Sequence, residues 1–98
     1  VKVRFFGRPV TIHRMSTAEW FDTFAEPLDW IYVDASHSYE GCLHDLTRAL
    51  EVIKPGGTLF GDDYGDKKPG VKKAVDKFIS NTGLKLNNFH ADQFEVKV

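Results

Sequence analysis

The chain is poor in cysteine and in long apolar runs, and neither sign of charge dominates it. Its single cysteine, Cys42, excludes an intrachain disulfide and fits a reducing compartment, so we expect a cytoplasmic protein. No apolar run approaches the roughly 20 residues of a membrane span, and no signal peptide is recognisable. The formal net charge is -1. We therefore expect neither a nucleic acid nor a membrane as partner.

Several motifs of enzyme sites are missing as well. The histidines and the cysteine do not have the spacing of a zinc site, and the chain contains neither a P-loop nor a Gly-x-Ser-x-Gly elbow. The chain starts with Val1 instead of methionine. This start indicates that the sequence begins inside a longer gene product or after a removed tag.

The composition is that of an ordinary globular domain. Of the 98 residues, 42% are hydrophobic and 28% are charged, which argues against disorder and for one domain over 1–98. Strand-like and helix-like segments alternate, and this alternation favours an α/β fold. Strands are expected at 10–13, 30–33, 58–60, 84–89 and 93–98, with a weaker candidate at 1–5. Helices are expected at 16–24, 38–53 and 69–79.

Two of these segments carry clear end signals. Ser16 precedes Glu19 at capping-box spacing, and Ser38 or His37 is placed to cap the next helix. The run at 30–33 is continuously apolar and aromatic, which is typical of a buried central strand. The last two strands are joined by a short connector at 90–92, which predicts an antiparallel hairpin.

Acidic residues follow two of the expected strands. Asp34 ends the first, and Asp62 with Asp63 ends the second. A helical crossover makes these strands parallel, so the acids meet at the carboxyl edge of the sheet, where open α/β folds bind ligands. Three converging carboxylates repel one another unless a cation or a hydrogen-bond donor lies between them, and oxygen ligands suit Mg²⁺, Ca²⁺ or Mn²⁺. The alternative is that these acids cap the turns and helices that follow.

Other candidate residues have two interpretations each. His37 follows Asp34 and is a candidate general base, or else a helix cap or an exposed loop histidine. Trp20 and Trp30 are expected in the core. A lysine run is expected to be a solvated helix face, with a weak contact to an acidic substrate as the alternative; it comprises Lys67, Lys68, Lys72, Lys73 and Lys77.

Four segments, in this order, resemble a known family. Residues 29–41 are similar to the fourth strand and following helix of class I S-adenosylmethionine-dependent methyltransferases of the methyltransferase domain 24 type. Residues 54–57 resemble the turn before the family's fifth strand, 61–64 the end of that strand, and 69–78 the next helix. The closing hairpin is similar to the reversed sixth and seventh strands. The resemblance covers about 10–98.

The resemblance implies a partial Rossmann-like sheet with the equivalents of strands 3-4-5-7-6, an antiparallel last pair and flanking helices. It also implies methyl transfer from S-adenosylmethionine, commonly to a hydroxyl oxygen of a small-molecule substrate. In metal-dependent relatives, Asp34, Asp62 and Asp63 correspond to Mg²⁺ ligands. Asp34, Ser16 and Thr17 correspond to positions near the cofactor, and His37 is the candidate base.

One departure from the family matters for function. The family's Gly-x-Gly-x-Gly loop and the acidic residue that binds ribose are missing, together with the first two strands. We therefore expect a single truncated domain with an uncovered strand edge, and such an edge favours pairing into a homo-oligomer or re-docking of the third strand. Two alternatives stay open. The chain is a non-catalytic oligomerising or binding module, or, with less support from the order of its acids, a receiver-like phosphoacceptor.

Overall fold

The computed structural model describes residues 2–5, 8–11, 14–23 and 26–98, which contain six strands and three helices. The strands are β1 (Lys2–Phe5), β2 (Arg8–Thr11), β3 (Leu28–Val33), β4 (Ile53–Gly61), β5 (Lys85–His90) and β6 (Gln93–Lys97). The helices are α1 (Thr17–Thr23), α2 (Tyr39–Val52) and α3 (Pro69–Thr82).

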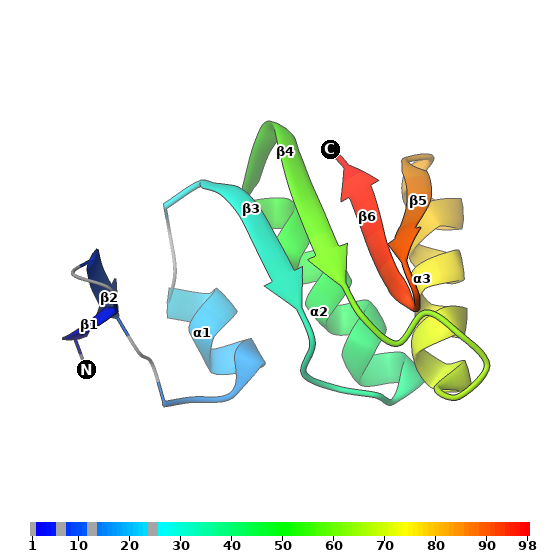
Figure 1. Cartoon of the computed structure of the whole chain (residues 1–98), viewed down its shortest axis with the longest axis horizontal. Helices are drawn as coiled ribbons and strands as arrows, with labels where there is room; N and C mark the ends of the chain where they lie inside the picture. Colours follow the sequence, from blue (N-terminus) through cyan, green and yellow to red (C-terminus); the bar gives the residue numbers. More distant parts are fainter. Residues whose placement is uncertain (1, 6–7, 12–13, 24–25) are drawn as a thin grey trace.

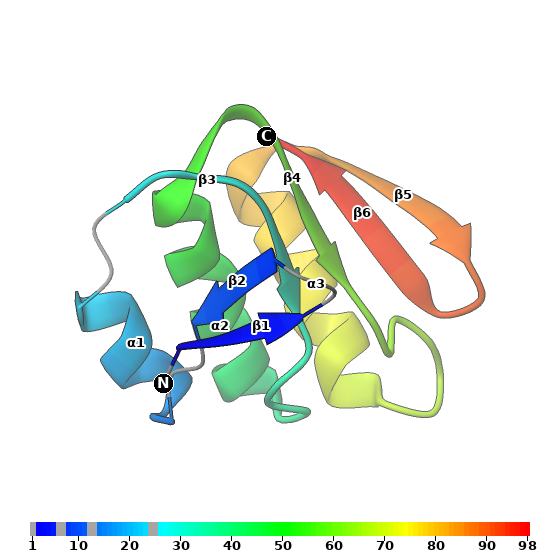
Figure 2. The ribbon, with the colours of Figure 1, turned by 60° about the vertical axis from the view of Figure 1, so that its left-hand side comes forward.

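The main sheet has four strands in the order β3-β4-β6-β5. β3 is parallel to β4, whereas β6 is antiparallel to both β4 and β5. Two helices, α2 and α3, lie side by side on one face of this sheet (Figures 1 and 2). The order corresponds to 4-5-7-6 of the methyltransferase sheet, so the predicted α/β class and the antiparallel closing hairpin are confirmed.

The ends of the helices follow from local chemistry. Ser38 caps α2, since its Oγ accepts a hydrogen bond from Gly41 N at 3.1 Å, as the sequence predicted. α3 begins at Pro69 and ends at Gly83, whose φ of 73° is a left-handed conformation that glycine adopts without strain.

The core lies between the sheet and the two helices. Side chains of α2 and α3 meet the inward-facing residues of β4 and β6 there. The largest fully buried side chains are those of Phe78, Phe94, Leu46, Leu59, Val75 and Val96. This layer fixes β4 relative to α2 and α3 and so determines where the loops that follow β3 and β4 emerge.

The first two strands form a separate antiparallel hairpin, with Val3 opposite Val10. The weak strand signal at 1–5 is therefore confirmed. The strand expected at 10–13 overlaps β2, although residues 12–13 lie outside the described part, and β2 pairs with β1 instead of joining the main sheet. In the family order, strands 2 and 1 separate strand 3 from strand 4.

The prediction that residues 30–33 form a buried central strand is wrong. β3 is the terminal strand of the sheet in the described part of the chain. Its side chains alternate, so that Trp30 and Tyr32 face away from the helices and are 61% and 43% exposed. Trp30 is therefore not a core residue. Its ring and that of Phe60 make a T-shaped contact, at a centroid distance of 6.3 Å.

None of the helices in the described ranges is long and apolar enough to cross a membrane.

Candidate functional site

The predicted convergence of acids at the sheet edge occurs in the structure. Val33 of β3 is in register with Gly61 of β4, and the two strands are parallel. The residues that follow them, Asp34 and Asp62, therefore leave the sheet at the same edge. The loops after β3 and β4 begin side by side there (Figure 1).

His37 joins this edge from the loop before α2. Its Nε2 lies 3.1 Å from Asp63 Oδ2 and 3.9 Å from Asp34 Oδ1. One ligand atom from each of Asp34, His37 and Asp63 fits within 4.8 Å of the others. We call these three residues the acid–histidine cluster. Two carboxylates and an imidazole at this separation are able to hold a divalent cation, and the imidazole is equally placed to accept a proton.

The loop that carries His37 is held by hydrogen bonds of its own serines and by a close contact with α3. The hydroxyls of Ser36 and Ser38 are hydrogen-bonded at 3.0 Å, and Ser38 caps α2. On the other side, Gly70 in the first turn of α3 approaches so closely that a Cβ there would lie 2.7 Å from the carbonyl oxygen of His37. The start of α3 therefore packs against the loop that carries His37 and limits the positions of its imidazole.

Asp63 has an unusual backbone conformation. Its φ is 67°, the left-handed region that residues with a Cβ rarely adopt. Asp62 supports this turn, because its Oδ1 accepts a hydrogen bond from the backbone N of Asp63 at 2.7 Å. One oxygen of Asp62 is thus committed to the turn, and the turn aims the Asp63 carboxylate at His37. Strain of this kind is often found at functional sites.

Tyr64 secures the segment that follows. Its hydroxyl donates a hydrogen bond to Asp76 of α3 at 2.6 Å, and this bond is the largest cause that raises the pKa of Tyr64 to about 12. Its backbone N donates to the carbonyl of Asp92 at 2.8 Å. The loop after β4 is therefore tied to α3 and to the β5–β6 turn.

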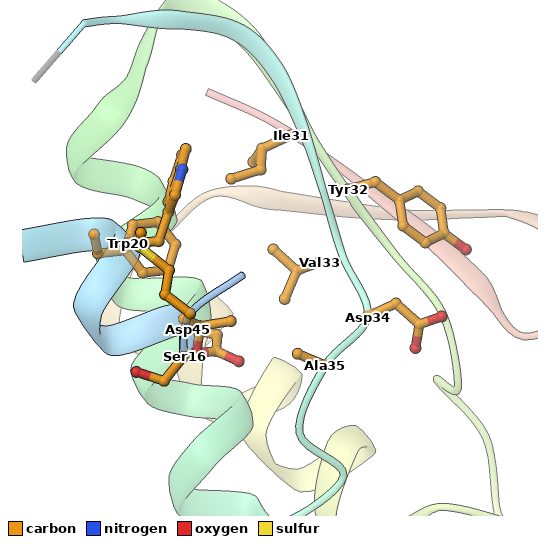
Figure 3. A pocket seen from close by; sticks show the side chains of 11 residues that line it. Ser16, Trp20, Ile31, Tyr32, Val33, Asp34, Ala35 and Asp45 are labelled. Carbon is orange, nitrogen blue, oxygen red and sulfur yellow. The ribbon is translucent and has the colours of Figure 1, made fainter. Parts of the chain in front are cut away.

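A cavity of about 280 Å³ lies beside the acid–histidine cluster, between α1, α2 and β3. Ile31 and Val33 point toward Trp20 across this cavity, whereas the Asp34 side chain points the other way, toward the loop after β4 (Figure 3). The residues around it are Met15, Ser16, Thr17, Trp20, Phe21, Ile31, Tyr32, Val33, Asp34, Ala35 and Asp45. Asp34 thus belongs both to the cavity wall and to the cluster.

Besides Asp34, the other two residues predicted to lie near the cofactor, Ser16 and Thr17, also line this cavity. Ser16 caps α1, because its Oγ accepts from Glu19 N at 3.1 Å. Thr17 donates its hydroxyl hydrogen bond to Asp45 Oδ1 at 2.8 Å. Ser16, Thr17 and Asp34 all lie in the wall of this one cavity, and their role as cofactor-binding residues stays a prediction.

The sequence analysis missed Asp45. This residue of α2 is only 3% exposed and lines the cavity. Helical spacing contained the signal, since positions 42, 45, 46 and 49 share one face and the other three are buried and apolar. Burial, with Asp45 nearby, raises the pKa of the Cys42 thiol to about 11, so this cysteine stays protonated and unreactive at neutral pH.

The fold and the edge cluster define a methyltransferase-like α/β domain, and comparison with known proteins agrees. A methyltransferase domain family matches residues 3–64, more than half of the chain. The chain belongs to this family. An uncharacterised protein of Acanthamoeba polyphaga mimivirus is 27% identical over 77 residues, which cover 76% of this chain and 34% of that protein.

Solved structures show the same fold. A proposed rRNA methylase from Clostridium thermocellum superposes with a TM-score of 0.69 at 18% identity, covering 94% of this chain and 59% of that one. A proposed O-methyltransferase from Klebsiella pneumoniae superposes with a TM-score of 0.67 at 18% identity. The match covers 89% of this chain and 48% of that one. The O-methyltransferase from Bacillus cereus in complex with S-adenosylhomocysteine superposes with a TM-score of 0.61 at 17% identity. The match covers 84% of this chain and 44% of that one. The chain thus spans about a third to three-fifths of the length of these proteins.

Proposed function

We propose that this domain takes part in methyl transfer from S-adenosylmethionine to a hydroxyl oxygen of a small molecule. The observation that carries the proposal is the acid–histidine cluster, which opens beside a cavity at the carboxyl edge of a methyltransferase-family sheet. Ligands of open α/β sheets bind at this edge. The solved relative with bound S-adenosylhomocysteine, the product of such a transfer, supports the choice of cofactor.

The residues divide into two groups in this proposal. The cavity, with Ser16, Thr17 and Asp34 in its wall, takes the adenosine part of the cofactor. His37 takes the proton from the acceptor hydroxyl. The acceptor oxygen forms a bond to the methyl carbon as the bond from that carbon to the sulfonium sulfur breaks, which leaves a neutral thioether. The displacement is in line, so positioning of the acceptor supplies much of the rate.

The cluster also fits a divalent cation. Asp34 and Asp63 offer carboxylate oxygens, which are the donors that Mg²⁺ prefers. A bound Mg²⁺ would lower the pKa of the acceptor hydroxyl and orient it. One oxygen of Asp62 already accepts a hydrogen bond from the backbone of Asp63, which leaves its other oxygen as a candidate ligand atom. The role of Asp62 as a further ligand stays a prediction.

The sequence contains no Gly-x-Gly-x-Gly loop, and a second copy of the chain would not supply one. In the described part of the chain β3 has a sheet partner on one side only. We propose that a strand of a second copy pairs with this open edge of β3. Trp30 and Tyr32 beside this edge are strongly exposed, which favours association. The same observation supports the second candidate function, a non-catalytic binding or oligomerising module. We expect either form to work in the cytoplasm.

The test is a transfer assay with isotopically labelled S-adenosylmethionine and a panel of small hydroxylated acceptors, with Mg²⁺ or with EDTA. We expect label in an acceptor, and a loss of at least about a hundredfold in His37→Ala, since positioned bases contribute 10²–10⁴-fold. Glu51→Gln serves as the control, because Glu51 is 60% exposed, lies in the last turn of α2 away from the cluster and is paired with Arg48 among the described residues. Folded, cofactor-binding protein without transfer would favour the non-catalytic module.

A further inference from the structure

A group of lysines lies on the loop after β4 and in the first turns of α3. The segment 64–77 contains five lysines and two aspartates, whereas the chain as a whole has a formal net charge of -1. In the described part of the chain, Lys72 is the one lysine of the five with an acidic partner within 4.0 Å, namely Asp66 at 3.7 Å. This segment therefore carries positive charge that the chain itself does not neutralise, and such a patch attracts anions.

Two of these lysines lie over aromatic rings that adjoin the acid–histidine cluster. Lys73 Nζ lies 4.8 Å from the centre of the Tyr39 ring, and Tyr39 is the first residue of α2, directly after a loop of the cluster. Lys72 Nζ lies 5.9 Å from the centre of the Tyr64 ring, and Tyr64 directly follows Asp63. Because a cation is attracted to the face of an aromatic ring, both flexible ammonium groups are held beside the cluster.

The start of α3 adds to this positive charge. Its first turn contains no acidic residue, and Lys68 at the N-cap position provides no side-chain hydrogen bond to the helix. The N-terminus of a helix carries a partial positive charge, which no acid of the first turn offsets here. The same turn packs through Gly70 against the loop of His37 (Figure 1). An anion attracted to this helix end would therefore lie close to the candidate base.

A hollow of about 290 Å³ lies between the loop after β4 and α3. Lys72 and Lys73 line it, together with the acids Asp66 and Asp76. The carboxylate of Asp76 already accepts the hydrogen bond from Tyr64. Asp66 is fully exposed, so its ion pair with Lys72 is weak and a stronger anion displaces it easily. Two ammonium groups in one hollow suit a phosphate group, whose oxygens accept charge-assisted hydrogen bonds.

We propose that Lys72 and Lys73 bind a phosphate group of the methyl acceptor, so that the substrate is a phosphorylated small molecule with a hydroxyl group. This inference rests on the proposed function and names the class of its acceptor. A nucleic acid fits less well, because its repeated phosphates need a longer basic surface. The lysines are confined to 67–77, and the chain as a whole is not basic.

The test compares small hydroxylated ligands that differ in one group. Glycerol 3-phosphate carries a phosphate, glycerate carries a carboxylate instead, and glycerol is neutral. Each is titrated into the ¹⁵N-labelled chain without divalent cations, so that no metal at the cluster bridges to the ligand. We expect glycerol 3-phosphate to shift the amide signals of residues 65–77 and to bind at least about tenfold more tightly than glycerol, because its hydrogen bonds join charged groups. Glycerate should bind more weakly than glycerol 3-phosphate.

Lys73→Gln is the test variant and Lys85→Gln the matched control. Both changes remove one positive charge from an exposed side chain. Lys85 lies opposite Lys97 in β6, at the end of the sheet away from the cluster. We expect Lys73→Gln to weaken the binding of glycerol 3-phosphate at least about threefold and Lys85→Gln to leave it unchanged. The comparison of ligands in the unaltered chain needs no substitution, so it stands even if a variant folds poorly.

Three results of these titrations would overturn the assignment. These are equal binding of glycerol 3-phosphate and either analogue, equal losses in folded Lys73→Gln and Lys85→Gln, and shifts that lie outside residues 65–77. Micromolar binding of a short single-stranded RNA at the same residues would assign the lysines to a nucleic acid and overturn the small-molecule acceptor.

The inference and the proposed function fail separately. Methyl transfer to neutral acceptors by a chain that does not bind glycerol 3-phosphate would leave the proposed function standing and reject only the phosphate site. Phosphate binding at residues 65–77 without methyl transfer to any phosphorylated or neutral acceptor would reject the proposed function, and with it the role of the phosphate as part of an acceptor.

Discussion

The imidazole of His37 lies 3.1 Å from a carboxylate oxygen of Asp63, although the two residues follow different strands of the sheet. Parallel pairing of β3 and β4 brings the two loops together, and the left-handed turn at Asp63 aims its carboxylate at the ring. This contact joins the candidate base to the candidate metal ligands, so our first two predictions concern it.

Binding of a divalent cation is the first prediction. Mn²⁺, which is paramagnetic and takes the same oxygen ligands as Mg²⁺, should broaden the amide signals of residues 34–37 and 62–64 at low occupancy. Asp63→Asn should weaken this binding at least about tenfold, a loss that is typical even of groups one step removed from a metal.

Asp66→Asn is the control for that experiment, because Asp66 is fully exposed and lies outside the acid–histidine cluster. Broadening that is spread over all surface acids, or that survives in Asp63→Asn, would contradict the assignment of a cation site to the cluster.

The backbone at residue 63 provides a second prediction. Asp63→Gly and Asp63→Ala both remove the contact to His37, but only glycine adopts a φ of 67° without strain. Asp63→Gly should therefore be more stable than Asp63→Ala by about 1 kcal/mol, measured by urea unfolding at neutral pH. Equal stability of the two variants would mean that residue 63 does not hold this conformation in solution.

Association through the edge of β3 is the third prediction. The chain should show a mass that rises with concentration in light scattering, and Trp30→Lys should weaken this association, since charge beside an open edge opposes strand pairing. In a Trp20→Phe background, Trp30 is the one remaining indole, and its fluorescence should shift to shorter wavelength as the chain associates. A constant monomer mass at high micromolar concentration is the opposing result.

The buried thiol makes the stability depend on pH in a specific window. The pKa of Cys42 is raised from 9.0 in the unfolded chain to about 11 in the folded chain, first by burial and then by Asp45. The unfolded chain loses this proton first, so the stabilisation is complete below pH 9 and is lost as the pH rises through about 11. The difference in unfolding free energy between the unaltered chain and Cys42→Ala should shrink over that interval. A difference that stays constant from pH 8 to pH 11 would contradict the raised pKa.

The sequence predicted features that depend on local chemistry and on parallel connection. Ser16 and Ser38 cap their helices because a hydroxyl in that position satisfies a free backbone N–H. Asp34 and Asp63 meet because a helical crossover makes their strands parallel. Both inferences need only neighbouring residues or the handedness of the chain.

The sequence did not predict which strand edges and helix faces are covered by other parts of the fold. The run around Trp30 has the composition of a central strand, but β3 has a partner on one side only in the described part, so alternate side chains face solvent. Asp45 was missed for a related reason. Helical spacing places Asp45 on the buried face of α2, but an acid on a helix is usually exposed. The hydrogen bond from Thr17 and the packing of α1 against α2 are long-range contacts that this spacing does not show.

Calorimetric titration of S-adenosylmethionine into the purified chain, with and without Mg²⁺, tests the central claim most directly. The account predicts micromolar binding that depends on protein concentration, because the cavity beside Asp34 is completed by pairing at the edge of β3. No detectable heat from folded protein at high ligand concentration would contradict it, and would leave a methyltransferase scaffold that no longer serves the cofactor.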